Sequence, residues 1–299
     1  MDKKTNQPYL YIMPALVLMT VLSLLPNAYS VYLAFTNFSL YHYTDFNFVG
    51  LKNFGKILAG PELQTFVKVL IWTLAWAAIS VMASLAIGLL LSIPLNREDL
   101  RGASIYRTLF IVPWAIPAFI SVLMWQGLLN SDQGAFNMLL QSLGFHKVAW
   151  LGDPGWARFS VLLVNIWLGY PFMMTVCLGA LQSIPKEIYE AADVDGASPW
   201  LQFRALTLPL LRSALVPVLV SSFAFNFNQF TAIYLLTEGG PTVPGSEAGA
   251  TDILLTYSYK LAFDLYQYGT ACAYAVFIFL IVAALSGANF RLTGAFEDD

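Results

Sequence analysis

The stretch EAADVDGASPWLQFRALTLP, from Glu190 to Pro209, shows how this chain is organised. It is polar and compatible with helix. It lies between two long apolar runs, since residues 159–185 and 213–237 contain no Asp, Glu, Lys or Arg. Each run is long enough to cross a bilayer, which needs about 20 apolar residues in a helix. The polar stretch is therefore predicted to lie outside the membrane, between two spans.

The same stretch carries local signals for two short helices joined by a turn. Ser198 and Pro199 suit the N-cap and first position of a second helix, so Asp195, Gly196 and Ala197 are predicted to form the turn before it. Gly196 and the small side chains near it allow another surface to approach the backbone closely. These small side chains belong to Ala191, Ala192 and Ala197.

Composition places the whole chain in the membrane class. Hydrophobic residues make up 58% and charged residues 11% of the sequence, and the mean hydropathy is +0.65. Backbone hydrogen bonding in lipid favours helices over open strands. The prediction is therefore an all-α integral membrane protein forming one domain over residues 1–299. The six predicted spans cover about residues 10–35, 69–95, 106–129, 159–183, 209–236 and 267–290.

Charge also predicts an orientation. With the amino and carboxyl termini in the cytoplasm, nine Lys and Arg residues fall in cytoplasmic segments and six outside, a modest positive-inside bias. The cytoplasmic set is Lys3, Lys4, Arg97, Arg101, Arg107, Lys186, Arg204, Arg212 and Arg291. The amino-terminal run resembles a signal peptide, but it is too long and lacks a convincing cleavage site, so it is expected to be the first span. The net charge of −3 without a basic tract argues against a nucleic-acid partner.

Neutral polar residues enter two of the predicted spans. In each span a polar residue belongs to a set of three residues at i, i+4 and i+7, which share one helical face. The two sets are Asn165, Gly169 and Phe172, with Tyr170 and Pro171 beside them, and Ser222, Asn226 and Gln229. Asn228 lies about 200° round the helix from Asn226 and is expected to face elsewhere. The two sets are predicted to face one cavity.

Amides at bilayer depth need hydrogen-bond partners, because an unsatisfied buried amide costs about 1 to 3 kcal/mol. Sugar hydroxyls are one candidate partner, with aromatic rings such as Phe172, Trp167 and Phe230 providing flat surfaces for a pyranose. The alternative is that the amides bond to each other and hold helices together. Gly169 and Pro171 have their own alternative as a helix kink.

The sequence offers little for other chemistry. GLKNFGKI, residues 50–57, has the spacing of a phosphate-binding loop, but Ile57 stands where Ser or Thr would hold magnesium, so a short external helix is expected. His42 and His146 lie in different loops without metal-ligand spacing, and no metal site is predicted. Cys177 and Cys272 fall inside spans and are expected to behave as small apolar residues. No nucleophile and base occur together, so no catalytic site is expected.

Several motifs together resemble a known transporter family. The motifs are VNIWLGYPFMM, IPKEIYEAADVDGASPW, TLPLL, SFAFNFNQF, LLTEGGP and ATDILLTYSYKLAF. They resemble the permease subunits of ATP-binding-cassette (ABC) importers, and in particular the larger maltose and maltodextrin permease of the MalF type. The similarity is specific over about the last 140 residues and rests on span pattern before that. The chain leaves no room for the large periplasmic domain of the enterobacterial version.

The resemblance implies a type I importer permease in the bacterial inner membrane. Its partners would be a second permease, two ATPase subunits and an extracytoplasmic sugar-binding protein, with ATP and magnesium bound only by the ATPases. Residues 185–208 would be the cytoplasmic loop that docks on an ATPase, through Glu190, Ala191, Ala192, Asp195, Gly196 and Ala197. The sugar site would use Asn165, Gly169, Tyr170, Phe172, Ser222, Asn226 and Gln229. Phe172 and Gln229 stand where the family example has a Tyr and an Asn, so the identity of the sugar stays open. A glucose-containing oligosaccharide of the maltose or maltodextrin kind is the first expectation, and another oligosaccharide is the alternative.

Two other classes compete with this interpretation. An ion- or proton-coupled secondary transporter would usually place ionisable residues near the midplane and often shows inverted repeats. The six predicted spans contain no central Asp, Glu, Lys or Arg. A membrane-embedded enzyme would need a catalytic constellation, which the sequence does not offer. The importer permease is therefore the favoured function.

Overall fold

The computed structural model describes residues 7–97 and 99–292, and these confirm the all-α prediction. Within this part of the chain the only β-type pairings are two isolated bridges, Thr36–Phe48 and Thr242–Gly249. Five helical stretches are long and apolar enough to cross a membrane, and a sixth is counted if one sharply bent pair forms a single span. Lys3 and Lys4, which contribute to the predicted orientation, lie outside the described residues.

The chain divides into two compact units. The first comprises residues 1–66 and 258–280, and the second 67–257 and 281–299. The first unit contains α1 (Gln7–Met19), η1 (Thr20–Leu24), α2 (Leu25–Ala34), η2 (Leu40–His42) and α3 (Lys52–Ala59). The second contains α5 (Ala103–Ala115), α6 (Ala118–Leu128), α7 (Ala135–Ser142), α8 (Pro154–Gln182), α9 (Lys186–Val194), α10 (Pro199–Gln202), η3 (Phe203–Thr207), α11 (Leu208–Phe227) and α12 (Phe230–Thr237). Three helices contribute to both units: α4 (Leu63–Leu95), α13 (Leu254–Phe263) and α14 (Tyr268–Leu292).

Two predicted spans are interrupted in the structure. The range 106–129 is not one straight helix, because α5 ends at Ala115 and α6 begins at Ala118 after a bend of 89°. Pro117 disfavours helical geometry at the preceding residue, and Ile116 accordingly has an extended ψ of 132°. The predicted range 209–236 also splits, since α11 ends at Phe227 and α12 begins only at Phe230.

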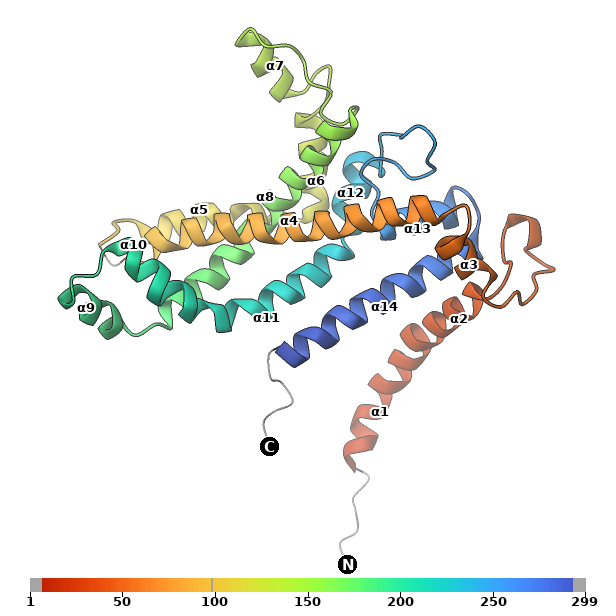
Figure 1. Ribbon diagram of the computed structural model, residues 1–299, viewed down its shortest axis with the longest axis horizontal. Helices are drawn as coiled ribbons and strands as arrows, with labels where there is room; N and C mark the ends of the chain where they lie inside the picture. The colour runs from red at the N-terminus through yellow and green to blue at the C-terminus, as the bar shows by residue number, and fades with distance from the viewer. Residues whose placement is uncertain (1–6, 98, 293–299) are drawn as a thin grey trace, which may run out of the picture. The chain divides into compact units, whose positions relative to one another are not determined.

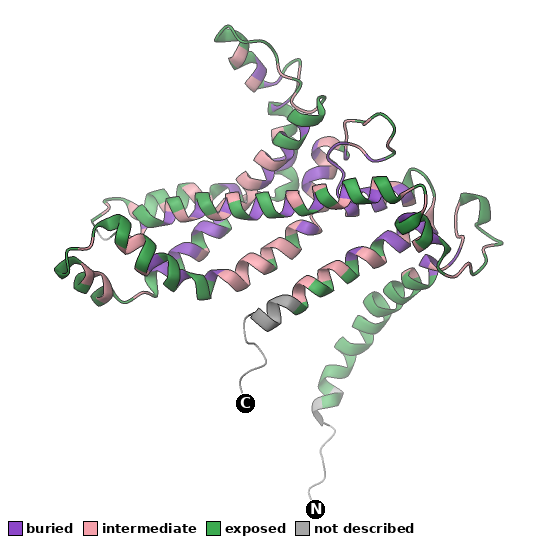
Figure 2. Ribbon diagram, viewed as in Figure 1, coloured by how far each residue is buried: buried purple, intermediate pink, exposed green. Residues whose placement is uncertain are grey.

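Two π-helical turns each precede a proline. The first, η1, ends two residues before Pro26, and the second, η3, ends two residues before Pro209. A proline ring clashes with the carbonyl four residues earlier and lacks the N–H that would bond to it. A wider turn at that point lets the helix continue. Both apolar runs therefore remain helical through a proline, and the first stays exposed along most of its length in Figure 2.

The first unit is closed around the short helix α3. The Asn53 side chain donates hydrogen bonds to the carbonyls of Ala34 (2.9 Å) and Thr36 (2.8 Å), where α2 ends. Gly269 packs so closely that an added Cβ would lie 2.4 Å from the Thr36 carbonyl. The segment with phosphate-loop spacing is thus a short helix, as predicted, and its polar side chain Asn53 is used for packing.

Close approach of α4 and α8 organises the second unit. A Cβ added to Gly88 would lie 2.6 Å from the backbone nitrogen of Met174, so no larger residue fits without moving α8. Small residues allow membrane helices to pack at this distance. Near the crossing, Cys177, Leu181, Leu211 and Leu215 form a buried apolar cluster between α8 and α11. Cys177 therefore behaves as the small apolar residue that the sequence suggests.

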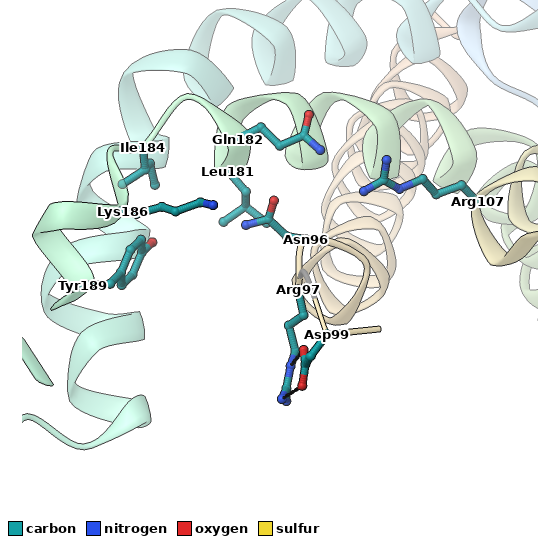
Figure 3. A pocket seen from close by; sticks show the side chains of 9 residues that line it. All are labelled: Asn96, Arg97, Asp99, Arg107, Leu181, Gln182, Ile184, Lys186 and Tyr189. Carbon is teal, nitrogen blue, oxygen red and sulfur yellow. Dashed lines mark hydrogen bonds and ion pairs between the residues drawn. The ribbon is translucent and has the colours of Figure 1, made fainter. Parts of the chain in front are cut away.

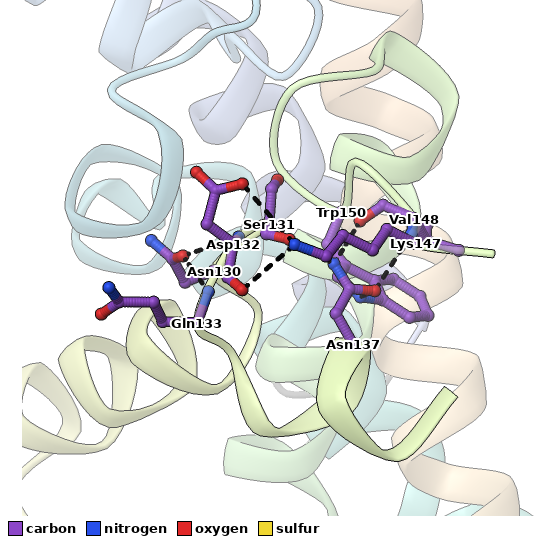
Figure 4. Close-up of polar contacts among 8 residues, drawn as sticks. All are labelled: Asn130, Ser131, Asp132, Gln133, Asn137, Lys147, Val148 and Trp150. Carbon is purple, nitrogen blue, oxygen red and sulfur yellow. Dashed lines mark hydrogen bonds and ion pairs between the residues drawn. The ribbon is translucent and has the colours of Figure 1, made fainter. Parts of the chain in front are cut away.

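At one end of this unit, α9 and α10 lie beyond the ends of α5 and α11, whereas α7 extends away from them beyond α6 (Figure 1). The loop around α7 is held by one buried amide, Asn137. Its side chain donates to the carbonyls of Ser131 and Val148, and it accepts from the Val148 N–H and the Trp150 indole (Figure 4). This loop is therefore ordered by a complete hydrogen-bond set.

Candidate functional site

Two of the predicted polar residues meet between helices. Asn165 of α8 donates from Nδ2 to Oδ1 of Asn226 on α11 over 2.7 Å. Asn226 in turn donates from Nδ2 to the Ser222 carbonyl over 2.8 Å, and Asn165 is only 6% exposed. One residue from each predicted set thus meets the other, Asn165 and Asn226. In this conformation their amides satisfy each other, which is the packing arrangement that competes with sugar binding.

Other predicted residues of the same site point to different neighbours. An added Cβ on Gly169 would lie 2.9 Å from the Ser84 hydroxyl oxygen, so this glycine permits contact with α4. Phe172 is partly exposed, and its ring centroid is 6.1 Å from that of Trp114 on α5. Tyr170, next to both in sequence, is partly buried. Gly169 therefore faces α4, and Phe172 packs against α5.

Gln229 departs from the predicted helical face. Helix α11 has already ended at Phe227, and Gln229 precedes α12 with φ −79° and ψ 96°. The i, i+4, i+7 relation to Ser222 and Asn226 therefore fails at its third member, because the chain is not helical there. Asn228 donates to the Ala224 carbonyl at 3.5 Å, a local contact within α11.

Aromatic residues of α4 and α6 join this region, and the predicted set does not include them. Trp76 is fully buried and donates from its indole to the Asn226 carbonyl over 3.0 Å. Trp167 makes an edge-on contact with Trp125 at a centroid distance of 5.7 Å. Trp72 and Trp76 are four residues apart and therefore share one face of α4. This spacing is the sequence signal that could have added Trp76 to the predicted set.

The polar loop has a defined turn at Gly196. Helix α9 ends in a Schellman arrangement, in which Gly196 N–H bonds to the Asp193 carbonyl and Ala197 N–H to the Ala192 carbonyl. Gly196 has φ of +74°, a conformation in which glycine is strongly preferred. Ser198 then caps α10 by accepting from the Leu201 N–H at 3.3 Å, with Pro199 in the first position. The predicted helix-turn-helix is confirmed.

Side-chain bonds hold the two halves of this loop together. Gln202 donates to the Asp193 carboxylate over 2.6 Å and to the Ala197 carbonyl over 3.1 Å. The Tyr189 and Thr207 hydroxyls lie 2.9 Å apart. The loop is therefore a preformed unit, whose geometry is set by its own contacts.

The outer face of the loop combines exposed charge with exposed apolar groups. Glu190 is exposed, and none of the ion pairs found in residues 7–97 and 99–292 involves it. Val194 is 88% exposed and Trp200 69% exposed, although both are apolar. The predicted set of small and acidic residues omits them. An exposed tryptophan in a polar loop is the signal that could have added them, because such residues are enriched where proteins bind partners.

Comparison with known proteins identifies the family. Residues 84–293 match the family model described as "Binding-protein-dependent transport system inner membrane component". The chain belongs to this family. It is therefore a permease component of the membrane, and the predicted resemblance to ABC importer permeases is confirmed.

Relatives span most of the chain. It is 38% identical over 297 residues to the galactooligosaccharides transport system permease protein GanP of Bacillus subtilis, covering 98% of this chain and 71% of that protein. It is 44% identical over 250 residues to the maltose/maltodextrin transport system permease protein MalF of Escherichia coli, covering 82% of this chain and 49% of that protein. The chain thus spans about half the length of its MalF relatives.

A solved structure has the same fold. The permease chain in the crystal structure of a bacterial ABC transporter for the acidic polysaccharide alginate superposes with a TM-score of 0.76. The alignment covers 96% of each chain at 22% identity. At this identity the likeness concerns the fold, which is that of a type I ABC importer permease.

Proposed function

We propose that this chain is the permease subunit of an ATP-driven importer that carries a neutral oligosaccharide across the bacterial inner membrane. A second permease would complete the path, two ATPase subunits would bind ATP and magnesium, and an extracytoplasmic protein would deliver the sugar. The preformed loop with Gly196 at its turn is the observation that carries the proposal. The permease itself would perform no chemistry.

The loop has the properties that docking on an ATPase requires. Its bonds through Asp193 and Gln202 fix the geometry before binding, so little conformational entropy is lost on contact. Val194 and Trp200 offer apolar surface that a partner can bury, and Glu190 offers a charge for a basic partner residue. ATP-driven closure of the ATPases would move two such loops together and open the path outward.

The class of sugar is proposed from the relatives. Both named relatives carry neutral oligosaccharides according to their names, maltodextrins for MalF and galactooligosaccharides for GanP. The sequence motifs favour a maltose-like oligosaccharide, and a galactooligosaccharide is the second candidate because GanP matches 98% of the chain. The mid-membrane amides would serve either sugar, since both present hydroxyls.

The experiment that tests this proposal is copurification of the assembled complex followed by ATPase measurements with its sugar-binding protein across a panel of sugars. We expect stimulation by one class of oligosaccharide, either maltodextrins or galactooligosaccharides. Absence of an ATPase from the purified complex would contradict the importer proposal. An acidic sugar as the best stimulant would contradict the substrate class alone.

For the sugar site, we expect the Asn165–Asn226 bond to open when sugar hydroxyls replace it. Asn226→Ala should then raise the sugar concentration for half-maximal transport by about 2- to 13-fold, the value of one polar contact. The amount of assembled complex should stay constant. Asn165→Ala should behave alike, and the double variant should be worse than either single one, because each amide would contact the sugar separately once their mutual bond has opened.

The matched control is Asn228→Ala, which removes only a long local contact within α11. If the Asn226 and Asn165 variants mainly reduce the yield of assembled complex, the amides serve helix packing, and the sugar assignment must be abandoned. The same holds if Asn228→Ala is equally damaging to transport.

Orientation is tested by cysteine labelling. In a background carrying Cys177→Ala and Cys272→Ala, Ser198→Cys should be labelled by a membrane-impermeant reagent only from the cytoplasm. Thr242→Cys should be labelled only from outside. Both native positions are exposed, so the reagent can reach them. Reversed labelling would overturn the proposed orientation and place the docking loop on the wrong side for an ATPase.

A further inference from the structure

Helix α4 buries a serine, Ser80, whose hydroxyl makes no hydrogen bond within the described part of the chain. The residue is 1% exposed, and its Oγ is a buried polar atom without a partner there. Two other buried hydroxyls of α4 are satisfied locally, since Thr73 donates to the Val69 carbonyl and Ser92 to the Leu89 carbonyl. A serine in a helix can ordinarily make such a bond to a carbonyl three or four residues back. The Ser80 hydroxyl is therefore available to another partner.

Contacts between α4 and α8 place this serine level with the amide pair. A Cβ added to Gly169 would lie 2.9 Å from the Ser84 hydroxyl oxygen. One turn further along α4, Gly88 meets the backbone of α8 about one turn after Gly169. The two helices thus run in the same direction where they touch. One turn before the contact of Ser84 with Gly169 lie Ser80 on α4 and Asn165 on α8.

The position around α4 directs Ser80 toward both helices that carry the amides. Trp76, Ser80 and Ser84 follow one another at intervals of four residues and share one face of α4. Trp76 donates to the Asn226 carbonyl on α11, and Ser84 contacts α8. Ser80 lies between these two contacts, at the level where the Asn165–Asn226 bond joins α8 to α11. The three helices therefore bring one hydroxyl and two amides to the same place.

This place is uncharged and lies far from the pocket beside the docking loop. That pocket has charged side chains in its lining, together with Asn96 just after α4 and Gln182 at the end of α8 (Figure 3). Asn96 follows Ser80 by 16 residues, which is roughly 24 Å along a helix. The parts of α4, α8 and α11 around Ser80 belong to stretches without Asp, Glu, Lys or Arg, at residues 69–96, 159–185 and 213–237. A neutral polar ligand suits these surroundings better than an ion.

We propose that Ser80 is a third polar ligand of the sugar site and exchanges a hydrogen bond with a sugar hydroxyl. A serine hydroxyl can both donate and accept, as each hydroxyl of a sugar can. In this conformation Ser80 is closed off, so the contact would form when the Asn165–Asn226 bond opens to admit the sugar. The inference rests on the proposed oligosaccharide import, and it adds α4 as a third wall of the site.

The test measures binding of labelled maltotriose and galactotriose to the purified, assembled complex without its sugar-binding protein. Ser80→Ala should weaken binding of the sugar that the wild type prefers by about 2- to 13-fold, the value of one hydrogen bond. The Tm of the sugar-free complex should stay the same or rise, because the variant removes a buried hydroxyl that has no partner. A fall in Tm and in the yield of assembled complex would assign Ser80 to helix packing and overturn the proposal.

The matched control is Ser92→Ala, which makes the same change at another buried serine of α4. Its hydroxyl is bonded locally and lies 12 residues further along, roughly 18 Å away. Its sugar affinity should equal that of the wild type. Unchanged affinity in Ser80→Ala, or an equal loss in Ser92→Ala, would overturn the role of Ser80 and leave the proposed import intact.

A second measurement uses the monodeoxy derivatives of the bound sugar, each of which lacks one hydroxyl. One derivative should bind equally well to the wild type and to Ser80→Ala, because the contact that the variant removes is already missing. If every derivative loses as much affinity in the variant as the parent sugar does, Ser80 acts through the amides, and its assignment as a sugar ligand is wrong. If the wild type binds neither sugar nor any derivative, the sugar site itself fails and Ser80 fails with it.

Discussion

Gly196→Trp should leave membrane insertion intact and reduce ATP-driven transport by about 30-fold or more. Gly196 occupies a left-handed conformation at φ +74°, which costs a residue with a side chain about 1 to 2 kcal/mol. The indole would also stand on the outer face of the loop, where nothing in the described chain lies within 4 Å of an added Cβ. A partner that seats there would be displaced, and a central contact is worth about 2 kcal/mol or more, or roughly 30-fold.

The matched control for this variant is Gly144→Trp. Gly144 has a similar φ of +83° and equally open surroundings, but it follows α7, away from the docking loop. It therefore carries the same backbone strain without the partner contact. The measurement is sugar uptake and ATPase activity of the assembled complex at matched expression. Normal transport by Gly196→Trp, or equal loss with Gly144→Trp, would remove the docking role.

Gly88→Leu should prevent the second unit from folding and abolish assembly of the complex. The added Cβ alone would lie 2.6 Å from the Met174 backbone nitrogen, and α8 cannot yield by rotating a side chain. Overpacking usually costs about 1 to 3 kcal/mol, and more is expected where backbone meets backbone. The measurement is the yield of monodisperse complex after purification from membranes.

Gly127→Leu on α6 controls for the change of residue type, because nothing lies within 4 Å of a Cβ added there. Its yield should match that of the wild type. A normal yield for Gly88→Leu would show that α4 and α8 do not cross closely at this point. The basis for the packing of the second unit would then be lost.

The helix, turn and cap of residues 185–208 are predicted well from the sequence, because each depends on local rules. The glycine at the turn, the serine cap and the proline at the first helical position each act within a few residues. These signals can be recognised in the sequence without knowledge of any tertiary contact. The start of α8 was also readable, since Asp153 caps it by accepting from the Gly155 and Trp156 N–H groups. The prediction began that helix five residues late because it used Arg158 as a boundary.

Arg158 shows why such boundaries fail. It lies inside α8, where Nε donates to the Ala250 carbonyl over 2.7 Å and the guanidinium stacks on the Trp72 ring at 4.7 Å. Those partners are 92 and 86 residues away in sequence, so the chain pattern alone does not reveal them. Because Arg158 is paired by residues far away in the sequence, it can lie inside α8. Composition alone placed the boundary of this helix at that charged residue.

The polar faces in the spans were predicted only in part, for a related reason. Spacing correctly brought Asn165 and Asn226 together, because both lie within regular helix. It failed at Gln229 because α11 ends two residues earlier. The prolines also differ in their effect on the helix, since Pro113 lies within α5 whereas Pro117 separates α5 from α6. Whether a proline ends a helix depends on the packing around it, and the spacing of apolar residues in the sequence carries no information about that packing.

Uptake of a labelled oligosaccharide into proteoliposomes tests the central claim most directly. The vesicles should hold this chain, its second permease and the ATPases, with the sugar-binding protein outside and ATP inside. Uptake should require internal ATP and should stop when the docking loop carries Gly196→Trp. Uptake by this chain alone, driven by a proton or sodium gradient without ATP, would contradict the account and favour a secondary transporter.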